Sequence, residues 1–425
     1  MKPVYVLTEF EKNPLMLDYE LSPEERNYLT YISMVNPIRP WEKRFYFDEL
    51  RNGLRIQTLN WVGVIELDGV RIVIQPKFDE GFVSLVEMIA FVEDLPFHQW
   101  KDTSGVNGKT DFLELLIRFY IRQLESLWNQ GLVKEYVEEE ENLQQLRGRP
   151  DFVQNLRANY YLPPRIFCRY DELVMDIPEN QVILLALESA MGFPLQRKTM
   201  QKLNQFRSQF EMICQPYPGK DWLRFTYHRL NAHYENVHRL TRYILGRTAL
   251  TSYHKGENAQ YYAFLLDMNE LFESFVAALL RKYLPRQSYR VRHGSRITDA
   301  IQKDGDSYRH VIPDLLVDYL PEKKVKVLDV KYKHYAGKKV ETSDIFQLAF
   351  YAQYHQKEEG VHSSAIIFPQ YKEDTSSIDE KINLLSGTSY GGELRLQSLS
   401  IEGILEWVRE RKKEELQQIA MKLIK

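Results

Sequence analysis

Apolar and polar residues alternate along the first part of the chain in a way that predicts β-strands. The stretches concerned alternate strictly or are rich in β-branched side chains, and they fall at residues 45–47, 54–59, 61–67, 70–74, 132–139 and 165–171. Asp68-Gly69, between two of them, predicts a tight hairpin. We therefore expect a β-rich N-terminal domain over residues 1–175.

Later in the chain apolar residues recur at helical spacing. An amphipathic helix is predicted from Phe112, and residues 180–247 are predicted to be helical. A further apolar stripe from Leu271 to Leu280 ends before Pro285.

Strands and one more helix follow that stripe. In order they are a strand at 310–320, a strand at 325–332, a helix at 343–355, and strands at 365–368 and 394–399. The predicted fold class is mixed α/β. The second domain spans 176–425, with a helical segment leading into an α/β core at about 261–400.

Composition narrows the class of protein. A chain of 425 residues is too long for one ordinary core, and its apolar fraction of 44% is typical of globular proteins. The N-terminus has no apolar signal segment, and charged residues interrupt the longest apolar run, so we expect a cytoplasmic protein with no membrane contact. Two distant cysteines, Cys168 and Cys214, argue against a disulfide framework or a structural zinc site.

Strand alternation brings reactive side chains onto one face of a predicted hairpin. Asp314 shares a face with Leu316 on the first strand, and Asp329 shares a face with Lys331 on the second. If the hairpin turns symmetrically about Glu322-Lys323, Asp314 lies opposite Lys331 and Leu316 lies opposite Asp329. Opposed Cβ atoms are about 5 Å apart, so two carboxylates and an ammonium group would converge.

Such a cluster suits phosphodiester hydrolysis. Asp314 and Asp329 would bind Mg²⁺, for which Mn²⁺ could substitute, and the Val330 carbonyl could be a further ligand. Lys331 would orient or deprotonate an attacking water. An aspartate two residues before a lysine is common and by itself is more often an exposed ion pair. Here the preceding Pro313-Asp314 pair and the hairpin strengthen the signal, as do Gln347 and Tyr351 on one face of the next helix.

These residues resemble the PD-(D/E)XK nuclease superfamily. The matching elements are Pro313-Asp314, Asp329-Val330-Lys331 and the helix segment from Gln347 to Tyr351, which is similar to the Q-x-x-x-Y helix of the RecB-like branch. The resemblance implies an acidic metal ligand on the helix before the sheet. Glu273 or Glu270 is the candidate, although either is as readily a solvated helix residue.

A closer resemblance, to the McrC family, covers most of the chain. The motifs are Trp-Val-Gly-Val-Ile at 61–65, Ile-Gln-Pro-Lys-Phe at 74–78, Leu-Arg-Gly-Arg at 146–149, Tyr-Asp-Glu at 170–172 with Asn180, Asp-Met-Asn-Glu-Leu-Phe-Glu at 267–273 and Lys-Tyr-Lys at 331–333. Their order along the chain is more specific than any one of them.

The McrC resemblance implies the nuclease subunit of a 5-methylcytosine-type restriction system, with double-stranded, methylated DNA as its expected substrate. It further implies a hexameric McrB-like AAA+ GTPase as partner, which would choose the site and translocate. The N-terminal part of this chain would dock on that ring and stimulate its hydrolysis of nucleotide. Arg147 and Arg149 are candidates to reach the partner, although ordinary loop salt bridges are the commoner role of such arginines.

The charge distribution is consistent with a partner that supplies part of the grip on DNA. Net charge is −3, whereas free-standing DNA binders are usually basic. Two basic runs nevertheless flank the proposed site. They comprise Arg281, Lys282, Arg286, Arg290, Arg292 and Arg296, and Lys323, Lys324, Lys326, Lys331, Lys333, Lys338 and Lys339.

Residues 105–110 resemble a phosphate-binding loop, but the glycine spacing and the preceding segment do not fit one. We expect no nucleotide to bind this chain itself. Two other functions stay open from the sequence. One is a regulatory adapter that activates an AAA+ ring and keeps a vestigial nuclease fold, and the other is a stand-alone RecB-like repair nuclease.

Overall fold

The computed structural model describes most of the chain. Residues 2–425 are described except for 12–13, 37, 79–80, 97–111, 162–163, 194, 220–222, 249–260, 334, 336–338, 356–361, 372–373, 375 and 385–391. The described chain forms two compact units, Met1–Leu115 with His254–Lys425, and Leu116–Tyr253. The phosphate-loop-like segment at 105–110 lies outside the described residues.

The N-terminal part of the first unit is built from two small sheets and a helix. The first sheet has the order β1 (Val4–Thr8), β8 (Arg71–Gln75), β7 (Trp61–Glu66) and β12 (Tyr262–Asp267). The second sheet has the order β2 (Leu15–Leu17), β6 (Gly53–Thr58) and β5 (Phe45–Leu50). Helix α1 (Pro23–Ser33) and the strand pair β3 (Met34–Asn36) and β4 (Arg39–Lys43) complete this part.

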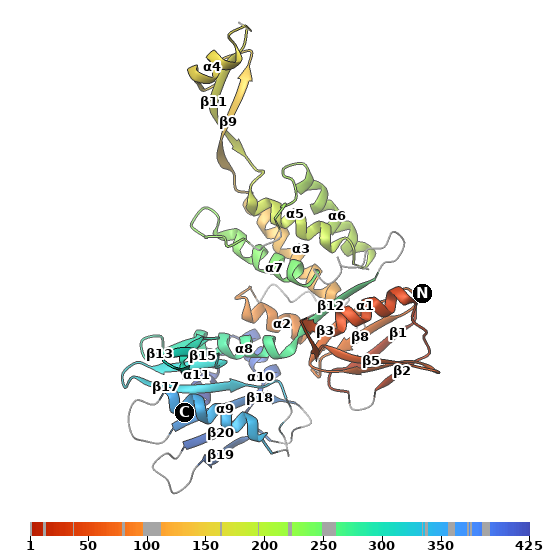
Figure 1. Ribbon diagram of the computed structural model, residues 1–425, viewed down its shortest axis with the longest axis vertical. Helices are drawn as coiled ribbons and strands as arrows, with labels where there is room; N and C mark the ends of the chain where they lie inside the picture. The colour runs from red at the N-terminus through yellow and green to blue at the C-terminus, as the bar shows by residue number, and fades with distance from the viewer. Residues whose placement is uncertain are drawn as a thin grey trace. The chain divides into compact units, whose positions relative to one another are not determined.

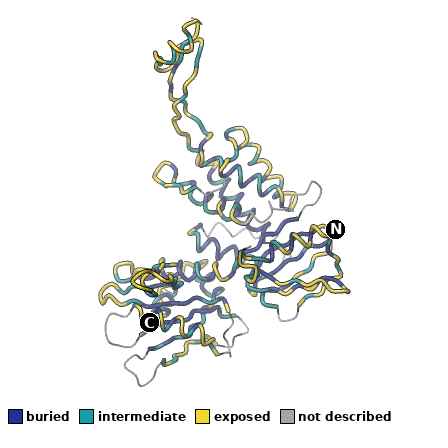
Figure 2. The backbone as a smooth tube through the Cα atoms, in the orientation of Figure 1, coloured by how far each residue is buried: buried dark blue, intermediate teal, exposed yellow. Residues whose placement is uncertain are grey.

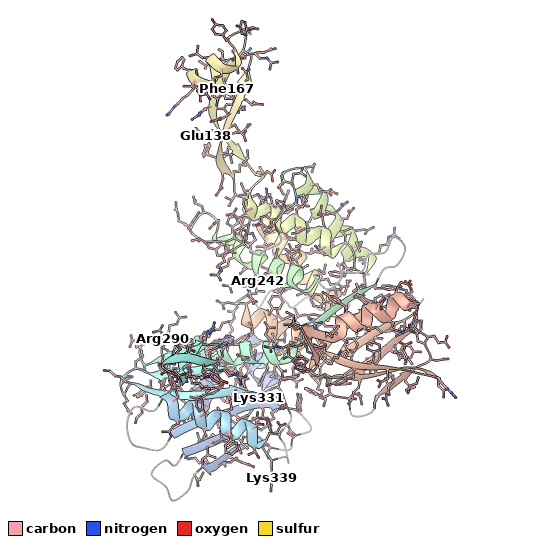
Figure 3. All side chains as sticks on the ribbon, in the orientation of Figure 1. Glu138, Phe167, Arg242, Arg290, Lys331 and Lys339 are labelled. Atoms are coloured by element: carbon pink, nitrogen blue, oxygen red, sulfur yellow. The ribbon has the colours of Figure 1, made fainter. Side chains whose placement is uncertain are left out.

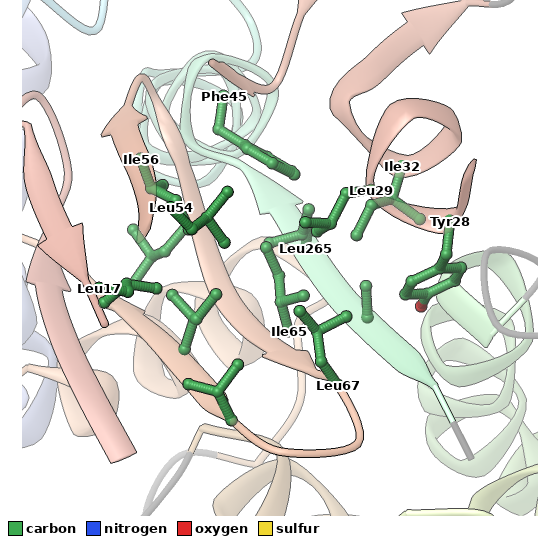
Figure 4. Close-up of a cluster of buried hydrophobic side chains, with 14 of the residues drawn as sticks. Leu17, Tyr28, Leu29, Ile32, Phe45, Leu54, Ile56, Ile65, Leu67 and Leu265 are labelled. Carbon is green, nitrogen blue, oxygen red and sulfur yellow. The ribbon is translucent and has the colours of Figure 1, made fainter. Parts of the chain in front are cut away.

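The predicted hairpin at Asp68-Gly69 is confirmed, because β7 pairs antiparallel with β8. Buried side chains from both sheets, from α1 and from β12 form one core, which includes Leu17, Tyr28, Ile65 and Leu265 (Figure 4). Gly63 adopts φ +140°, and a Cβ there would overlap the Phe264 carbonyl. A glycine is therefore required where β7 and β12 approach each other.

The C-terminal part of the first unit contains the larger mixed sheet. Its order is β13 (Tyr289–His293), β16 (Leu315–Tyr319), β17 (Lys324–Val330), β18 (His362–Gln370), β20 (Gly392–Ser400) and β19 (Asp379–Leu384). Helix α9 (Thr342–His355) packs against β17 and β18, while α8 (Met268–Tyr283) contacts β13 and β17 (Figure 1).

Three more helices pack in a group with α8. A separate pair of strands precedes β16 in the sequence. Helices α2 (Phe82–Val92) and α11 (Lys413–Leu423) pack on α8, and α10 (Ile401–Arg409) packs on α2 and α11. Strands β14 (Ile297–Lys303) and β15 (Asp306–Val311) form a two-stranded sheet of their own. The mixed α/β fold class predicted from the sequence is confirmed.

The second unit consists of helices and a long hairpin. Helix α3 (Phe112–Gln130) enters it, followed by α5 (Pro178–Ala190), α6 (Arg197–Glu211) and α7 (Glu235–Thr248). Strands β9 (Glu135–Leu143) and β11 (Ile166–Val174) pair antiparallel and extend from these helices. The short strand β10 (Arg149–Pro150) and helix α4 (Phe152–Ala158) lie toward the far end of the hairpin (Figure 1).

The units do not follow the expected division between residues 1–175 and 176–425. That boundary falls inside the second unit, between β11 and α5. The reason is strand pairing across the chain: β12 completes the N-terminal sheet by pairing with β7. Helix α2 likewise packs on α8, with the Phe91 and Phe275 rings 4.9 Å apart. Residues before 115 and after 254 therefore share buried surface.

The predicted strand over 310–320 is wrong in one respect, because it is two strands. β15 ends at Val311 and pairs with β14, whereas β16 begins at Leu315 and pairs with β13 and β17. Pro313 lies in the break, where a residue without an N–H cannot continue a ladder. Among the described helices, none is both long enough and apolar enough to span a membrane.

Candidate active site

The β16–β17 hairpin has a register that differs from the predicted one by two residues. Leu316 pairs with Val327 and Leu315 with Leu328, so the next position places Asp314 opposite Asp329. The predicted pairing of Asp314 with Lys331, and of Leu316 with Asp329, is therefore wrong. The turn is centred on Pro321-Glu322, one residue earlier than expected. A shift of two residues keeps every side chain on its predicted face.

Asp314 and Asp329 are brought together at the end of this hairpin. The Val330 N–H donates a hydrogen bond of 2.9 Å to Asp314 Oδ2, which holds the Asp314 carboxyl against the second strand. Asp329 is buried in the sheet, where β17 also pairs with β18. Its Oδ2 atom is buried and accepts no hydrogen bond from any N–H group of the described residues.

The pKa values of the two carboxyls reflect this crowding. Burial raises the pKa of Asp314 well above its ordinary value, and the negative charge of Asp329 raises it further. Burial also raises the pKa of Asp329, although the positive charge of Lys331 acts in the opposite direction. Two adjacent carboxylates in a low-dielectric site repel each other unless a cation or a proton neutralises them.

Lys331 supplies one positive charge to this pair. Its Nζ lies 3.0 Å from Asp329 Oδ1. Burial opposes the lysine charge, but Asp329 and Asp314 outweigh it and raise the pKa of Lys331. The backbone N–H of Lys331 donates a hydrogen bond of 2.9 Å to the Ile367 carbonyl. The chain therefore stays paired with β18 one residue beyond the end of β17 (Lys331 is labelled in Figure 3). The ammonium is therefore held, charged, beside the carboxylates.

Asp344 is a buried acid of this site that the sequence reasoning missed. It lies in the first turn of α9, accepts a 3.0 Å hydrogen bond from the Tyr335 hydroxyl, and has Lys333 Nζ 4.0 Å away. Its charge raises the pKa of both Asp329 and Lys331. The available signal was an acid in the first turn of the helix that carries Gln347.

Gln347 and Tyr351 lie on α9 as predicted, four residues apart. Gln347 is exposed, and its Nε2 donates to the Tyr351 hydroxyl at 3.1 Å. Tyr351 is buried in the core that includes Leu316 and Val327 on the sheet. The helix face of Tyr351 is thus the face that packs on the strands carrying the two aspartates, while Gln347 is at its solvent edge.

The two candidate glutamates of α8 differ in their surroundings. Glu273 Oε1 lies 2.7 Å from His293 Nε2, and the charge of Glu273 contributes to the raised pKa of Asp314. Glu270 lies in the first turn of α8 and is exposed. Of the two, Glu273 is therefore nearer to the aspartates in its electrostatic effect, but its carboxylate is engaged by a histidine.

The oxygen atoms of this site could act as ligands of a divalent metal ion. Among the described residues, no group of three or more His, Cys, Asp and Glu side chains could hold a metal ion by itself. Mg²⁺ does not require such a cage, since it is commonly bound by one or two carboxylates, water and substrate phosphate. Asp314 and Asp329 meet that requirement. Asp329 Oδ2 has no hydrogen-bond donor among the described residues, so this oxygen is available to a cation. The residues present fit Mg²⁺.

Several residues of the two basic runs form ion pairs with acidic side chains of this chain. Lys282 pairs with Asp94 at 2.9 Å, and Arg292 donates to Asp318 at 2.9 Å. In the second run, Lys333 pairs with Glu341 at 3.3 Å. Four exposed arginines of the first run make no ion pair within the described part of the chain, namely Arg281, Arg286, Arg290 and Arg296 (Arg290 is labelled in Figure 3).

Residues 56–369 match the family described as McrBC 5-methylcytosine restriction system component. No curated protein matches the sequence. Among solved structures, the chain is similar to one in a refined half-complex from the tetradecameric assembly of Thermococcus gammatolerans McrB AAA+ hexamers with bound McrC. That match has a TM-score of 0.62 and 17% sequence identity, and covers 93% of this chain and 94% of that chain.

A second match is to a chain of the cryo-EM structure of the Thermococcus gammatolerans McrBC complex. It has a TM-score of 0.47 and 17% identity, and covers 66% of this chain and 88% of that chain. At this identity the first of the two likenesses shows a shared fold.

Proposed function

The chain belongs to the family of McrBC 5-methylcytosine restriction system components, and we propose that it is a subunit that cuts DNA with Mg²⁺ in such a system. The single observation that supports cleavage is the convergence of Asp314, Asp329 and Lys331 at one end of the β16–β17 hairpin. A structural ion pair needs one acid and one base. A second, partly buried carboxylate that the first one repels favours instead a site that binds a cation.

Asp314, Asp329 and the Val330 carbonyl would hold the metal ion. Bound there, Mg²⁺ supplies acidification of a coordinated water and positive charge against a phosphate in its transition state. Lys331 has a raised pKa and so keeps its proton at neutral pH. We infer that it orients the attacking water and offsets negative charge, rather than acting as a general base.

The residues of α9 complete the proposed site. Gln347 is exposed beside the buried Tyr351, to whose hydroxyl it donates, and can turn its amide toward a phosphate of the substrate. Tyr351 keeps the helix packed on the strands that carry the aspartates. Asp344, on the same helix, adds a negative charge that keeps Lys331 protonated.

We further propose an McrB-like AAA+ GTPase hexamer as partner, with double-stranded, methylated DNA delivered by that ring. The similar Thermococcus gammatolerans structure contains McrB AAA+ hexamers with bound McrC. Residues 61–65 lie in β7, every residue of which is buried, so this motif builds the core of the fold instead of offering a contact surface. The Arg147–Arg149 stretch is exposed on the hairpin of the second unit.

The far end of this hairpin is suited to docking. Phe152 and Leu156 on α4 are 72% and 70% exposed, and none of the residues of α4 is buried (Figure 2). Large apolar side chains gathered on one exposed element mark an interaction surface. Arg147 lies 3.8 Å from the centroid of the Tyr170 ring and pairs with Glu172, so it is held in place near this surface.

Cleavage of methylated plasmid DNA by the chain, its AAA+ partner, GTP and Mg²⁺ tests the proposal. Lys331→Ala should lower the cleavage rate by about 100-fold or more, because the charge beside the reacting phosphate is lost. Metal binding should persist. Lys303→Ala, the control, removes an exposed lysine of β14 that belongs to neither basic run and should cut normally. Equal cleavage by both variants would favour the regulatory adapter with a vestigial nuclease fold.

A further inference from the structure

A buried hydrogen bond joins the N-terminal strand region to the residue that follows Lys331. The Tyr332 hydroxyl donates to Glu9 Oε1 at 2.6 Å, across 323 positions of sequence. Both side chains are 0% exposed. Glu9 directly follows β1, and its own N–H donates to the Gln75 carbonyl at 2.9 Å, so the acid is fixed to the N-terminal sheet.

The surroundings of this bond hold both partners in one orientation. The Lys77 N–H donates to the same Glu9 oxygen at 2.9 Å, and the Lys77 charge faces the carboxylate. Tyr371 interacts with the Tyr332 hydroxyl, and the Phe272 ring of α8 lies 5.7 Å from the Tyr332 ring. Tyr332 is therefore enclosed by groups from the N-terminal sheet, from α8 and from the segment after β18.

Burial of a carboxyl group at this point is energetically unfavourable. Burial, the largest cause, raises the pKa of Glu9 to about 7, although the hydrogen bonds from Tyr332 and Lys77 lower it. Glu9 Oε2 is buried and makes no hydrogen bond within the described residues. An apolar pair of the same size would stabilise the fold at least as well, so a role beyond packing is indicated for this acid.

The position of Tyr332 supplies that role. Along an extended backbone successive side chains point to opposite sides, so Tyr332 faces α8 while Lys331 faces Asp329. The backbone N–H of Lys331 is hydrogen bonded to the Ile367 carbonyl. The residue that follows it, Tyr332, is hydrogen bonded to Glu9, so the backbone at Lys331 is fixed at two neighbouring points. Rotation of the backbone at 331 would break one of these bonds.

We propose that Glu9 and Tyr332 are positioning residues that set the placement of Lys331 in the catalytic site from the opposite face of the sheet. This inference rests on the proposed function, because it concerns the same lysine. It assigns to the N-terminal sheet a part in catalysis, separate from any contact with a partner. The N-terminal sheet and the larger sheet of the first unit then act together in catalysis, because Glu9, directly after β1, supports the segment that follows β17 and carries Lys331.

The experiment compares Tyr332→Phe with Tyr19→Phe in the complete complex with the AAA+ partner. Tyr19 also donates a 2.6 Å hydrogen bond to a glutamate, Glu25, within the same unit, so both substitutions remove one such bond. Tyr332→Phe should lower kcat for DNA cleavage by roughly 10- to 100-fold, the range expected when a catalytic group moves by about 1 Å. The KM for DNA, Mg²⁺ affinity and GTPase stimulation should stay at wild-type values. Tyr19→Phe should keep the wild-type kcat.

Variants of Glu9 provide a second readout that separates positioning from folding. Glu9→Gln retains an acceptor oxygen for Tyr332 and should keep kcat within about 3-fold of wild type. That change is smaller than the effect expected from losing an ordinary hydrogen bond. Glu9→Leu removes the acceptor and should match Tyr332→Phe. Adding Tyr332→Phe to Glu9→Leu should cost little more, because the two residues act through one bond.

The possible failures are distinguishable. A folded Tyr332→Phe chain that cuts as fast as Tyr19→Phe, beside an active wild type, overturns the positioning role alone. The positioning role is also overturned if Glu9→Gln and Glu9→Leu lower kcat by the same factor, because the acceptor oxygen that Gln retains would then make no difference. A wild-type chain that cuts no DNA overturns the proposed function and the positioning role together.

Discussion

The Asp314 carboxylate accepts a 2.9 Å hydrogen bond from the backbone N–H of Val330, the residue between Asp329 and Lys331. This bond crosses the hairpin and ties the first acid to the strand that carries the second acid and the lysine. The geometry therefore does not depend on side-chain pairing alone, since the backbone of β17 orients Asp314. It also holds Asp314 close enough to Asp329 for their charges to repel.

Asp314→Asn should stabilise the metal-free protein at about pH 8 and abolish its response to Mg²⁺. The amide keeps an acceptor for Val330 but removes the charge that Asp329 repels. We expect a gain on the order of 1–3 kcal/mol in the free energy of unfolding without metal, and the loss of stabilisation by Mg²⁺. Thermal unfolding with and without Mg²⁺ measures both. A variant that Mg²⁺ stabilises as well as the wild type would exclude Asp314 as a ligand.

Glu9→Gln should change how stability depends on pH. The pKa of Glu9 is raised from 4.5 to about 7 in the folded protein, so its protonated form favours folding at acidic pH, and this contribution is lost as pH rises through about 7. Relative to wild type, Glu9→Gln should therefore gain on the order of 3 kcal/mol between about pH 5 and pH 8. Lys77, Tyr332 and Tyr371 face the carboxyl, and the charge of Lys77 lowers the pKa of Glu9 less than burial raises it. Parallel stability curves for the two proteins would contradict the raised pKa.

Substitutions at the far end of the hairpin should separate partner activation from folding. Phe152→Asp and Leu156→Asp alter side chains that are 72% and 70% exposed, so the free energy of unfolding should change by less than about 0.5 kcal/mol. Each should reduce stimulation of the partner GTPase by at least about 10-fold, because a charge replaces an apolar contact. Tyr308→Asp, at a 68% exposed position on β15, is the matched control. Full stimulation by both α4 variants would place the docking surface elsewhere.

Deletion of residues 1–175 is not a clean test of docking. It would remove β7, with which β12 pairs, and α2, which packs on α8. The buried core shared by Ile65 and Leu265 would be lost as well. Point substitutions on α4 avoid this, because that helix contributes nothing to the core of the first unit.

Local patterns in the sequence were sufficient to predict which residues lie at the centre of the candidate site. Two-residue periodicity placed Asp314, Asp329 and Lys331 on shared faces, and the error of two residues in register left those faces unchanged. The hairpin at Asp68-Gly69 and the helix carrying Gln347 were predicted from equally local signals.

Long-range features could not be predicted in this way. Nothing local to Glu9 indicates that it meets Tyr332, 323 positions away. The parallel pairing of β1 with β8 and the closure of the N-terminal sheet by β12 depend on the whole fold, so the expected domain boundary differed from the structural units. The break at Pro313 was signalled by the proline, but the strand prediction ran through it.

Asp329→Asn tests whether Asp329 is part of a metal-dependent nuclease site. The change keeps the shape of a buried side chain and removes one ligand charge. The measurement is the rate of cleavage of methylated DNA by the complete complex with GTP and Mg²⁺, with the exposed Asp306→Asn as control. We predict a loss of at least about 1,000-fold with GTPase stimulation unchanged, whereas Asp306→Asn cuts normally. Cleavage by Asp329→Asn at the wild-type rate would exclude Asp329 from the reaction and place the active site elsewhere.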